Sequence, residues 1–159
     1  MQASNYPTTK RPGVLLLISF ALCVAASSFG AMFQPGEWYD TLRLAPWNPP
    51  KLAFPIAWSV LYVMIALSGW VIFKSRQRPL IFLWLTQLAF NASWSWVFFG
   101  QRWLFAGMVI IAIIWALVLL LCKRCCMQPD LKTAGLLLIP YLCWLTLAFS
   151  LNAYIWLYN

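Results

Sequence analysis

The chain has little charge, few acids and no histidine. Only 9% of its 159 residues are charged, and the three acidic residues are Glu37, Asp40 and Asp130. Soluble domains carry roughly 25% charged residues, so this composition excludes an ordinary soluble fold. The missing histidine removes the usual haem ligand and the base of a Ser-His-Asp set. No carboxylate lies inside a hydrophobic run, which argues against a proton-coupled pump.

Five cysteines are present, but their pattern does not favour a metal site. Cys23 and Cys143 lie inside hydrophobic runs, where a free cysteine behaves as a small hydrophobe. Cys122, Cys125 and Cys126 lie together at the end of a run, with no second cysteine pair to face them. We therefore predict no metal site and interpret the cysteines as structural or incidental.

Long hydrophobic runs are abundant, and 64% of the residues are hydrophobic. A helix needs about 20 mostly apolar residues to cross a bilayer. Five stretches meet this length, near residues 13–33, 53–73, 80–99, 104–122 and 134–157. We predict an all-α membrane protein, a bundle of five transmembrane helices in one domain over residues 13–159. Residues 1–12 are predicted to form a mobile polar tail.

The first hydrophobic stretch could instead be a signal peptide. Its uncharged run is longer than a typical signal-peptide core, which favours a retained helix. The net charge of +8 does not indicate nucleic-acid binding, because the basic residues flank the runs rather than form one patch. Most of them precede the first run or lie in the second and fourth loops, while Arg43, Lys51 and Arg102 fall on the other side. The positive-inside rule then predicts a cytoplasmic N-terminus and an outer first loop.

That first loop, residues 34–52, is unusual for a connector. Residues 38–50 contain two tryptophans, one tyrosine and three prolines. Proline stiffens the backbone, and aromatic rings supply flat contact area. The loop is therefore predicted to form a semi-rigid lid over a cavity.

Three of the predicted helices carry a stripe of aromatic or polar residues at helical spacing. The third has Gln87, Asn91, Trp94, Ser95 and Phe98. The fifth has Tyr141, Trp144, Ala148, Asn152 and Trp156, and the second has Phe54, Trp58, Tyr62, Ile65 and Gly69. Amides inside a membrane must be paired. Two interpretations of the third-helix stripe are therefore equally supported: hydrogen bonding between helices, or the polar wall of a cavity. Small Ala148 leaves a notch for a neighbouring helix or a ligand edge.

These residues fall into a pattern of short motifs. They are Trp38-Tyr39, Pro46-Trp47-Asn48-Pro49-Pro50, Trp58, Gln87-Leu88-Ala89-Phe90-Asn91, Phe98-Phe99-Gly100 and Pro140-Tyr141-Leu142-Cys143-Trp144. In this order the motifs resemble the TspO/MBR family, which comprises bacterial tryptophan-rich sensory proteins and the mitochondrial translocator protein. The resemblance covers nearly the whole chain beyond residue 12.

The resemblance implies a five-helix protein, usually a homodimer, that binds protoporphyrin IX or related tetrapyrroles in a pocket capped by the first loop. A metal-free tetrapyrrole needs no axial ligand, so no cofactor is required and the porphyrin itself is the ligand. With Gln87 from the polar stripe, the expected ligand-binding residues are Trp38, Trp58, Tyr62, Gln87, Asn91, Trp94, Trp144, Ala148 and Leu151. Small residues at four-residue spacing, such as Ala21 with Ala25 and Ala26 with Gly30, could pack a dimer.

The chain departs from the family at its sterol motif. Ala153 stands at the usual tyrosine position and Leu157 at the basic position, so sterol is a weak candidate partner. This departure suggests a bacterial member in the cell membrane.

The leading hypothesis is an integral membrane receptor or sensor for porphyrins, with Arg43 and Lys51 near the propionates. One alternative is an enzyme that degrades porphyrin in light, for which the resemblance points to Trp58 and Trp144. A porphyrin or sterol transporter and a partner-binding scaffold are further alternatives. Acid–base catalytic residues are not expected.

Overall fold

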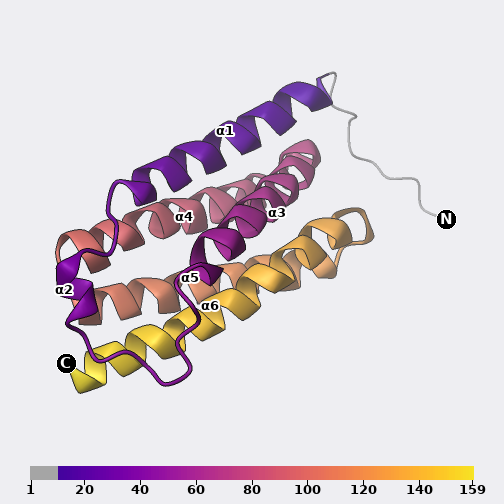
Figure 1. The fold of residues 1–159 in the computed structure, drawn as a ribbon. Coiled ribbons are helices and arrows are strands. Elements are labelled where there is room, and N and C mark those ends of the chain that lie inside the picture. The colour runs from indigo at the N-terminus through magenta and orange to yellow at the C-terminus, as the bar shows by residue number, and fades with distance from the viewer. Residues whose placement is uncertain (1–10) are drawn as a thin grey trace.

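The computed structural model describes residues 11–159, and the regular elements of this part of the chain are all helices, with no β-strand. Five long helices lie alongside one another (Figure 1). They are α1 (Pro12–Ala31), α3 (Ala53–Ser75), α4 (Arg78–Ser95), α5 (Leu104–Cys126) and α6 (Lys132–Tyr158). Three short elements connect them: α2 (Glu37–Asp40), the π-helix η1 (Trp96–Gly100) and the 3-10 helix η2 (Pro129–Leu131). The predicted all-α class is confirmed; most of the predicted N-terminal tail, residues 1–10, lies outside the described residues.

Four segments of the described chain are long and apolar enough to span a membrane. They are Pro12–Ala31, Ala53–Ser75, Leu104–Cys126 and Pro129–Tyr158. The sequence predicted a fifth span within residues 80–99. Its helix, α4, forms, but polar side chains such as Gln87 and Asn91 lower its hydropathy below that of the other four.

The predicted third helix also changes type before its end. Regular α-helix stops at Ser95, and the next five residues form η1. At the end of this turn the Gln101 N–H donates to the carbonyl of Trp96 over 2.9 Å. Such π-turns are frequent at functional sites. A hydrophobic pattern with a period of 3.6 residues does not reveal this insertion.

Close helix packing depends on two glycines that face large rings. Trp84 of α4 is completely buried against Gly69 of α3, where an added Cβ would lie 2.5 Å from the indole. The Trp84 indole N–H donates to the Ile65 carbonyl over 3.2 Å. A Cβ on Gly107 of α5 would lie 2.7 Å from the ring of Phe98. Small residues of this kind let membrane helices approach closely.

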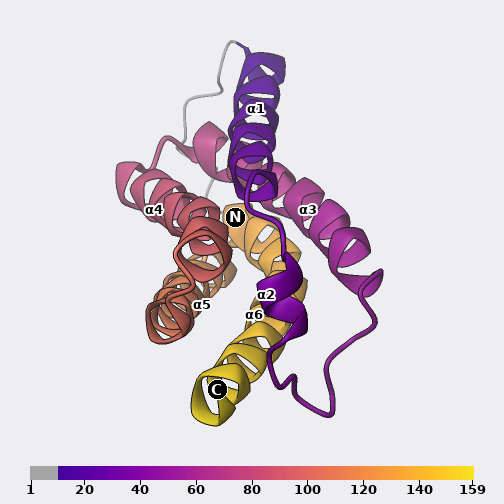
Figure 2. The same ribbon diagram turned by 60° about the vertical axis from the view of Figure 1, so that its left-hand side comes forward.

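The predicted lid lies across one end of the bundle. The chain enters it from α1, forms α2, and returns to α3 through an extended segment (Figure 2). The C-terminus lies at the same end, while α1 begins at the opposite end (Figure 1). The lid is therefore placed to contact η1 on one side and the end of α6 on the other.

Candidate functional site

Asn91 of α4 is the polar centre of the bundle. The Tyr62 hydroxyl of α3 donates to Asn91 Oδ1 over 2.6 Å. The Asn91 amide in turn donates from Nδ2 to the hydroxyl of Tyr141 on α6 over 2.7 Å. Asn91 is 7% exposed and Tyr141 is completely buried. One uncharged amide thus joins three helices inside the protein.

Aromatic rings from α3 and α6 surround this polar group. The centroid of Trp58 lies 5.6 Å from that of Tyr62, 6.1 Å from that of Tyr141 and 6.4 Å from that of Trp144. Phe54 meets Trp144 edge-on at 5.7 Å. We call these five rings the inner aromatic cluster. Trp58, Tyr62 and Trp144 are only half-buried, so part of each residue is left uncovered by the protein.

A second group of rings joins the lid to α4. Trp94 stacks on Phe98 of η1, with centroids 5.2 Å apart and planes 17° apart. Trp38 and Tyr39 of the lid meet Phe98 edge-on at 6.3 and 6.4 Å. Tyr39 also meets Phe99 at 5.5 Å. We call this group the lid aromatic cluster; its packing depends on η1, which supplies both phenylalanines.

Several buried polar atoms have no hydrogen-bond partner among the described residues. They are both side-chain polar atoms of Gln87, the indole nitrogen of Trp94, and the Oδ1 atoms of Asn48 and Asn152. An unsatisfied buried polar group costs roughly 1–3 kcal/mol. Gln87 is completely buried one helical turn before Asn91, on the same face of α4. Such unpaired groups need a functional or structural explanation, and a ligand contact is one.

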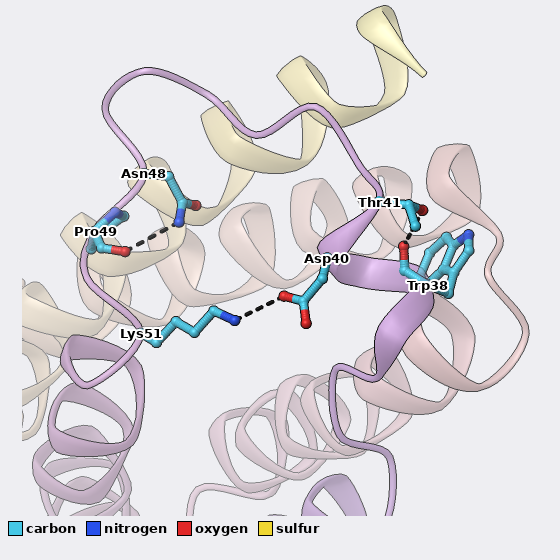
Figure 3. Close-up of polar contacts among 6 residues, drawn as sticks. All are labelled: Trp38, Asp40, Thr41, Asn48, Pro49 and Lys51. Atoms are coloured by element: carbon cyan, nitrogen blue, oxygen red, sulfur yellow. Dashed lines mark hydrogen bonds and ion pairs between the residues drawn. The ribbon is translucent and has the colours of Figure 1, made fainter.

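The lid is held together internally by short polar contacts (Figure 3). Lys51 Nζ lies 2.8 Å from Asp40 Oδ1, and this ion pair links the beginning and the end of the lid. Both side chains are well exposed, so the pair contributes at most about 1 kcal/mol. The Thr41 hydroxyl donates to the Trp38 carbonyl over 2.7 Å. Burial, followed by the charge of Asp40, raises the pKa of Tyr39, so its hydroxyl stays neutral.

The lid is also fastened to the end of α6. The Arg43 N–H donates to Asn159 Oδ1 over 2.8 Å, and Asn159 Nδ2 donates to the Arg43 carbonyl over 3.3 Å. The Trp47 indole donates to the Ser150 hydroxyl over 3.2 Å and meets the ring of Tyr154 at 5.4 Å. Sequence reasoning missed this attachment, because Asn159 and Ser150 belong to no stripe or motif and lie more than 100 residues from their partners.

The predicted ligand-binding residues fall into four groups in the structure. Trp58, Tyr62, Asn91 and Trp144 are linked by the direct contacts above, while Trp38 and Trp94 meet through Phe98. Gln87 lies beside this set on α4. Ala148 and Leu151 lie further along α6, where Leu151 is buried and the Ala148 carbonyl accepts a hydrogen bond from Asn152 over 3.0 Å.

Two rings in this site were absent from the predicted ligand set. Tyr141 pairs with Asn91, and Phe98 bridges the lid to Trp94. Both stood in the predicted stripes, so their helix face was correct. Their direct roles were missed because spacing places a residue on a face without identifying its partner.

The sequence matches a known protein family. The model of the TspO/MBR family matches residues 19–157. The chain belongs to the TspO/MBR family. It is 35% identical over 150 residues to the protein CrtK of Rhodobacter capsulatus, covering 91% of this chain and 92% of the relative. It is 36% identical over 140 residues to the tryptophan-rich sensory protein of Cereibacter sphaeroides, covering 87% of each.

An animal relative shows how widely the family extends. The translocator protein of Ovis aries is 30% identical over 152 residues, with 87% of each chain covered. The resemblance identified from the sequence motifs is therefore confirmed.

The hydrogen bonds of Asn91 generate a stability prediction. Asn91→Leu leaves two tyrosine hydroxyls without their partner, one of them completely buried. We expect a loss of about 1–3 kcal/mol in the free energy of unfolding. The combination of Asn91→Leu with Tyr62→Phe and Tyr141→Phe removes all three polar groups and should recover most of that loss. Unfolding in detergent, followed by tryptophan fluorescence, measures both; a triple variant less stable than Asn91→Leu alone contradicts the prediction.

Proposed function

We propose that this protein is an integral membrane receptor that binds a porphyrin, protoporphyrin IX or a related tetrapyrrole, between the inner aromatic cluster and the lid. The observation that carries the proposal is the placement of half-buried Trp58, Tyr62 and Trp144 around the uncharged Asn91 centre. Binding of a flat apolar ligand is stabilised when its apolar surface is removed from water, and such a ligand packs well against aromatic rings.

The polar groups of the site suit such a ligand. The inner aromatic cluster contains no formal charge, and it contacts Asn91 through two tyrosine hydroxyls. The unpaired amide of Gln87 and indole N–H of Trp94 offer further hydrogen bonds. A tetrapyrrole combines a broad apolar face with a few polar groups. Ligand sites of this kind are mostly apolar, with a small number of placed polar groups that set orientation.

The name of one bacterial relative favours a sensory role. One bacterial relative is named a tryptophan-rich sensory protein, and the animal relative is named a translocator protein. Binding of a tetrapyrrole beneath a fastened lid would couple ligand occupancy to the position of the outer loop. In this proposal the ligand changes the lid, and the lid is the surface that reports it.

Porphyrin titration in the dark tests the proposal. We expect saturable quenching of tryptophan fluorescence with about one porphyrin per chain in detergent. Trp58→Ala and Trp144→Ala should each raise the Kd about tenfold, which corresponds to about 1.4 kcal/mol, because each removes an aromatic wall of the inner aromatic cluster. Trp103→Ala is the matched control, since Trp103 is 58% exposed and lies outside both clusters.

Two results would contradict the proposed function. Quenching that rises linearly without saturation would indicate partition of the porphyrin into the detergent. Equal affinity in the two cluster variants and the Trp103 control would place the ligand elsewhere.

The same rings favour a second candidate function, porphyrin degradation in light. Trp58 and Trp144 lie in edge-to-face contact at 6.4 Å, next to two tyrosines, so four oxidisable rings are contiguous. An indole can give one electron to an excited porphyrin, dioxygen can then add to the reduced macrocycle, and the adduct can return one electron to the oxidised indole. The net change is the addition of one dioxygen to the porphyrin, with the indole restored. Illumination of the complex in air should yield a new absorbing product, and Trp58→Phe should abolish it. Equal loss of porphyrin with heat-denatured protein would exclude catalysis.

We further propose that α4 and η1 together form the fifth membrane span, with the N-terminus in the cytoplasm. Their 18 and five residues would extend roughly 33 Å along the helix axis, enough for a hydrocarbon core about 30 Å thick. The polar side chains Gln87 and Asn91 are buried among the other helices rather than facing lipid. The excess of basic residues on the N-terminal side sets the orientation.

Reporter fusions test this topology. Five spans place Asn159 on the outer side, so alkaline phosphatase fused there should be active and green fluorescent protein should be dark. A fusion after Gln77 is the control and should give the opposite pattern, because α1 and α3 precede it. Bright green fluorescence at Asn159 would indicate four spans and exclude α4 as a membrane helix.

A homodimer, in a bacterial cell membrane, is part of the same proposal. Within one chain Gly30 already faces α4, since an added Cβ would lie 3.4 Å from the Ser95 hydroxyl. Ala21 and Ala25 are exposed on α1 and leave a small-residue surface for a second copy. Sterol remains a weaker candidate ligand.

A further inference from the structure

The end of the bundle that carries the lid holds three basic residues with different surroundings. Lys51 is paired with Asp40 at 2.8 Å. The guanidinium carbon of Arg43 lies 5.3 Å from the centroid of Tyr158, and that of Arg102 lies 5.5 Å from the centroid of Trp38. Within residues 11–159, neither arginine has a carboxylate within ion-pair distance. Glu37 on α2 also lies at this end but forms no ion pair with either arginine, so both guanidinium groups are without a paired carboxylate in the described chain.

Arg102 is held in an unusual backbone conformation. Its φ of 59° lies in the left-handed region, which costs a non-glycine residue roughly 1–2 kcal/mol. Hydrogen bonds fix the chain on both sides, since Gln101 donates to Trp96 over 2.9 Å and Trp103 donates to Val97 over 3.2 Å. A strained residue persists when its surroundings determine its conformation. The loop after η1 thus fixes the position from which the Arg102 side chain extends.

The guanidinium of Arg102 lies over the ring of Trp38 but donates no hydrogen bond to an acceptor within the described chain. A cation over an aromatic face is held electrostatically. The donors of a guanidinium lie in its own plane, in a fork that fits a carboxylate with two parallel hydrogen bonds. In the described chain, no side-chain donor of Arg102 makes a hydrogen bond to another residue. The group is therefore positioned and available.

A row of rings connects this guanidinium to the candidate site. Trp38 beneath it meets Phe98, and Phe98 stacks on Trp94 of α4. Arg43 lacks this connection: Tyr158 beneath it contacts Tyr154, which contacts Trp47 in the lid. The two arginines thus have the same local chemistry, but only Arg102 adjoins the lid aromatic cluster.

We propose that Arg102 binds a carboxylate of the ligand and holds it at the edge of the lid. The inference rests on the proposed function and narrows the ligand class to flat apolar acids, whose ring system lies inside and whose acidic arm reaches the outer surface. The sequence had suggested Arg43 and Lys51 for this role. Lys51 is already paired with Asp40, and Arg43 lies over Tyr158, which belongs to neither aromatic cluster.

A pair of porphyrins that differ only in charge provides the test. Protoporphyrin IX carries two carboxylates, and its dimethyl ester has the same ring without them. Both are titrated into wild-type protein, Arg102→Gln, Arg102→Lys and the matched control Arg43→Gln. Gln and Lys have the same backbone restriction as Arg at a left-handed position, and size-exclusion chromatography verifies that each variant is folded.

The expected pattern is specific to one residue and one ligand. Arg102→Gln should raise the Kd of the diacid about tenfold or more, because the variant loses a hydrogen bond to a charged group. Arg102→Gln should leave the Kd of the ester unchanged. The Kd of the diacid for Arg102→Lys should lie between those for the wild type and Arg102→Gln, because lysine keeps the charge but lacks the forked guanidinium. Arg43→Gln should change neither ligand.

Other patterns overturn the inference in different ways. Equal weakening of acid and ester by Arg102→Gln would mean that the residue only shapes the lid. Equal weakening of the diacid by Arg43→Gln would mean a general charge effect, and no weakening would exclude Arg102. If the wild type binds neither porphyrin, the proposed function fails and the inference fails with it.

A lipid phosphate presents similar chemistry to a guanidinium, so the titration is repeated in two nanodiscs. One contains only phosphatidylcholine and the other includes phosphatidylglycerol. The same Arg102 effect in both assigns the residue to the ligand carboxylate. An effect that appears only with phosphatidylglycerol assigns Arg102 to the headgroup and overturns the inference.

Discussion

The hydrogen bonds of the Asn91 amide are the interaction on which the arrangement of the bundle depends. A bilayer core offers no water, so polar side chains on its helices must find partners inside the protein. Asn91 meets this requirement by accepting from Tyr62 on α3 and donating to Tyr141 on α6. Because both bonds require defined geometry, they fix the rotation of α3, α4 and α6 about their axes. That rotation directs Trp58 and Trp144 to the same place.

The position of the lid depends on this arrangement indirectly, through α4 and η1. The rotation of α4 determines where η1 begins, and η1 presents Phe98 and Phe99 to the lid. The opposite arm of the lid is fastened to α6 through Asn159, whose amide bonds both backbone groups of Arg43. Each attachment is small, and the ion pair between Asp40 and Lys51 is exposed. A lid held by several weak contacts can open without unfolding the helices that it covers.

The sequence predicted the helical class and the faces of its helices, but not the contacts between them. Periodicity placed Asn91 with Trp94 and Tyr141 with Trp144, because a repeat near 3.6 residues is a local property. The π-turn at Trp96–Gly100 was missed, because one inserted residue is set by tertiary packing rather than by local pattern. The bonds of Asn159 to Arg43 were also missed, since nothing in either residue's neighbourhood encodes a contact 116 positions away. The predicted fifth span at residues 80–99 differs from the structure in the same way: the buried amides of α4 lower its hydropathy, and four segments of the described chain are long and apolar enough to cross a membrane.

The distribution of charge follows from these constraints and bears on selectivity. Ionised groups are expensive in the bilayer core, so the inner aromatic cluster relies on a neutral amide and two neutral hydroxyls. At the end of the bundle that carries the lid, Asp40 pairs with Lys51, and in the described chain neither Arg43 nor Arg102 forms an ion pair. A ligand that is apolar throughout would gain area burial but nothing at the rim, and a compact anion would gain at the rim but nothing inside. An extended ring system with an acidic edge satisfies both environments at once. Specificity would then arise from the separation between the neutral interior and the charged rim, which is a property of the whole fold rather than of one side chain.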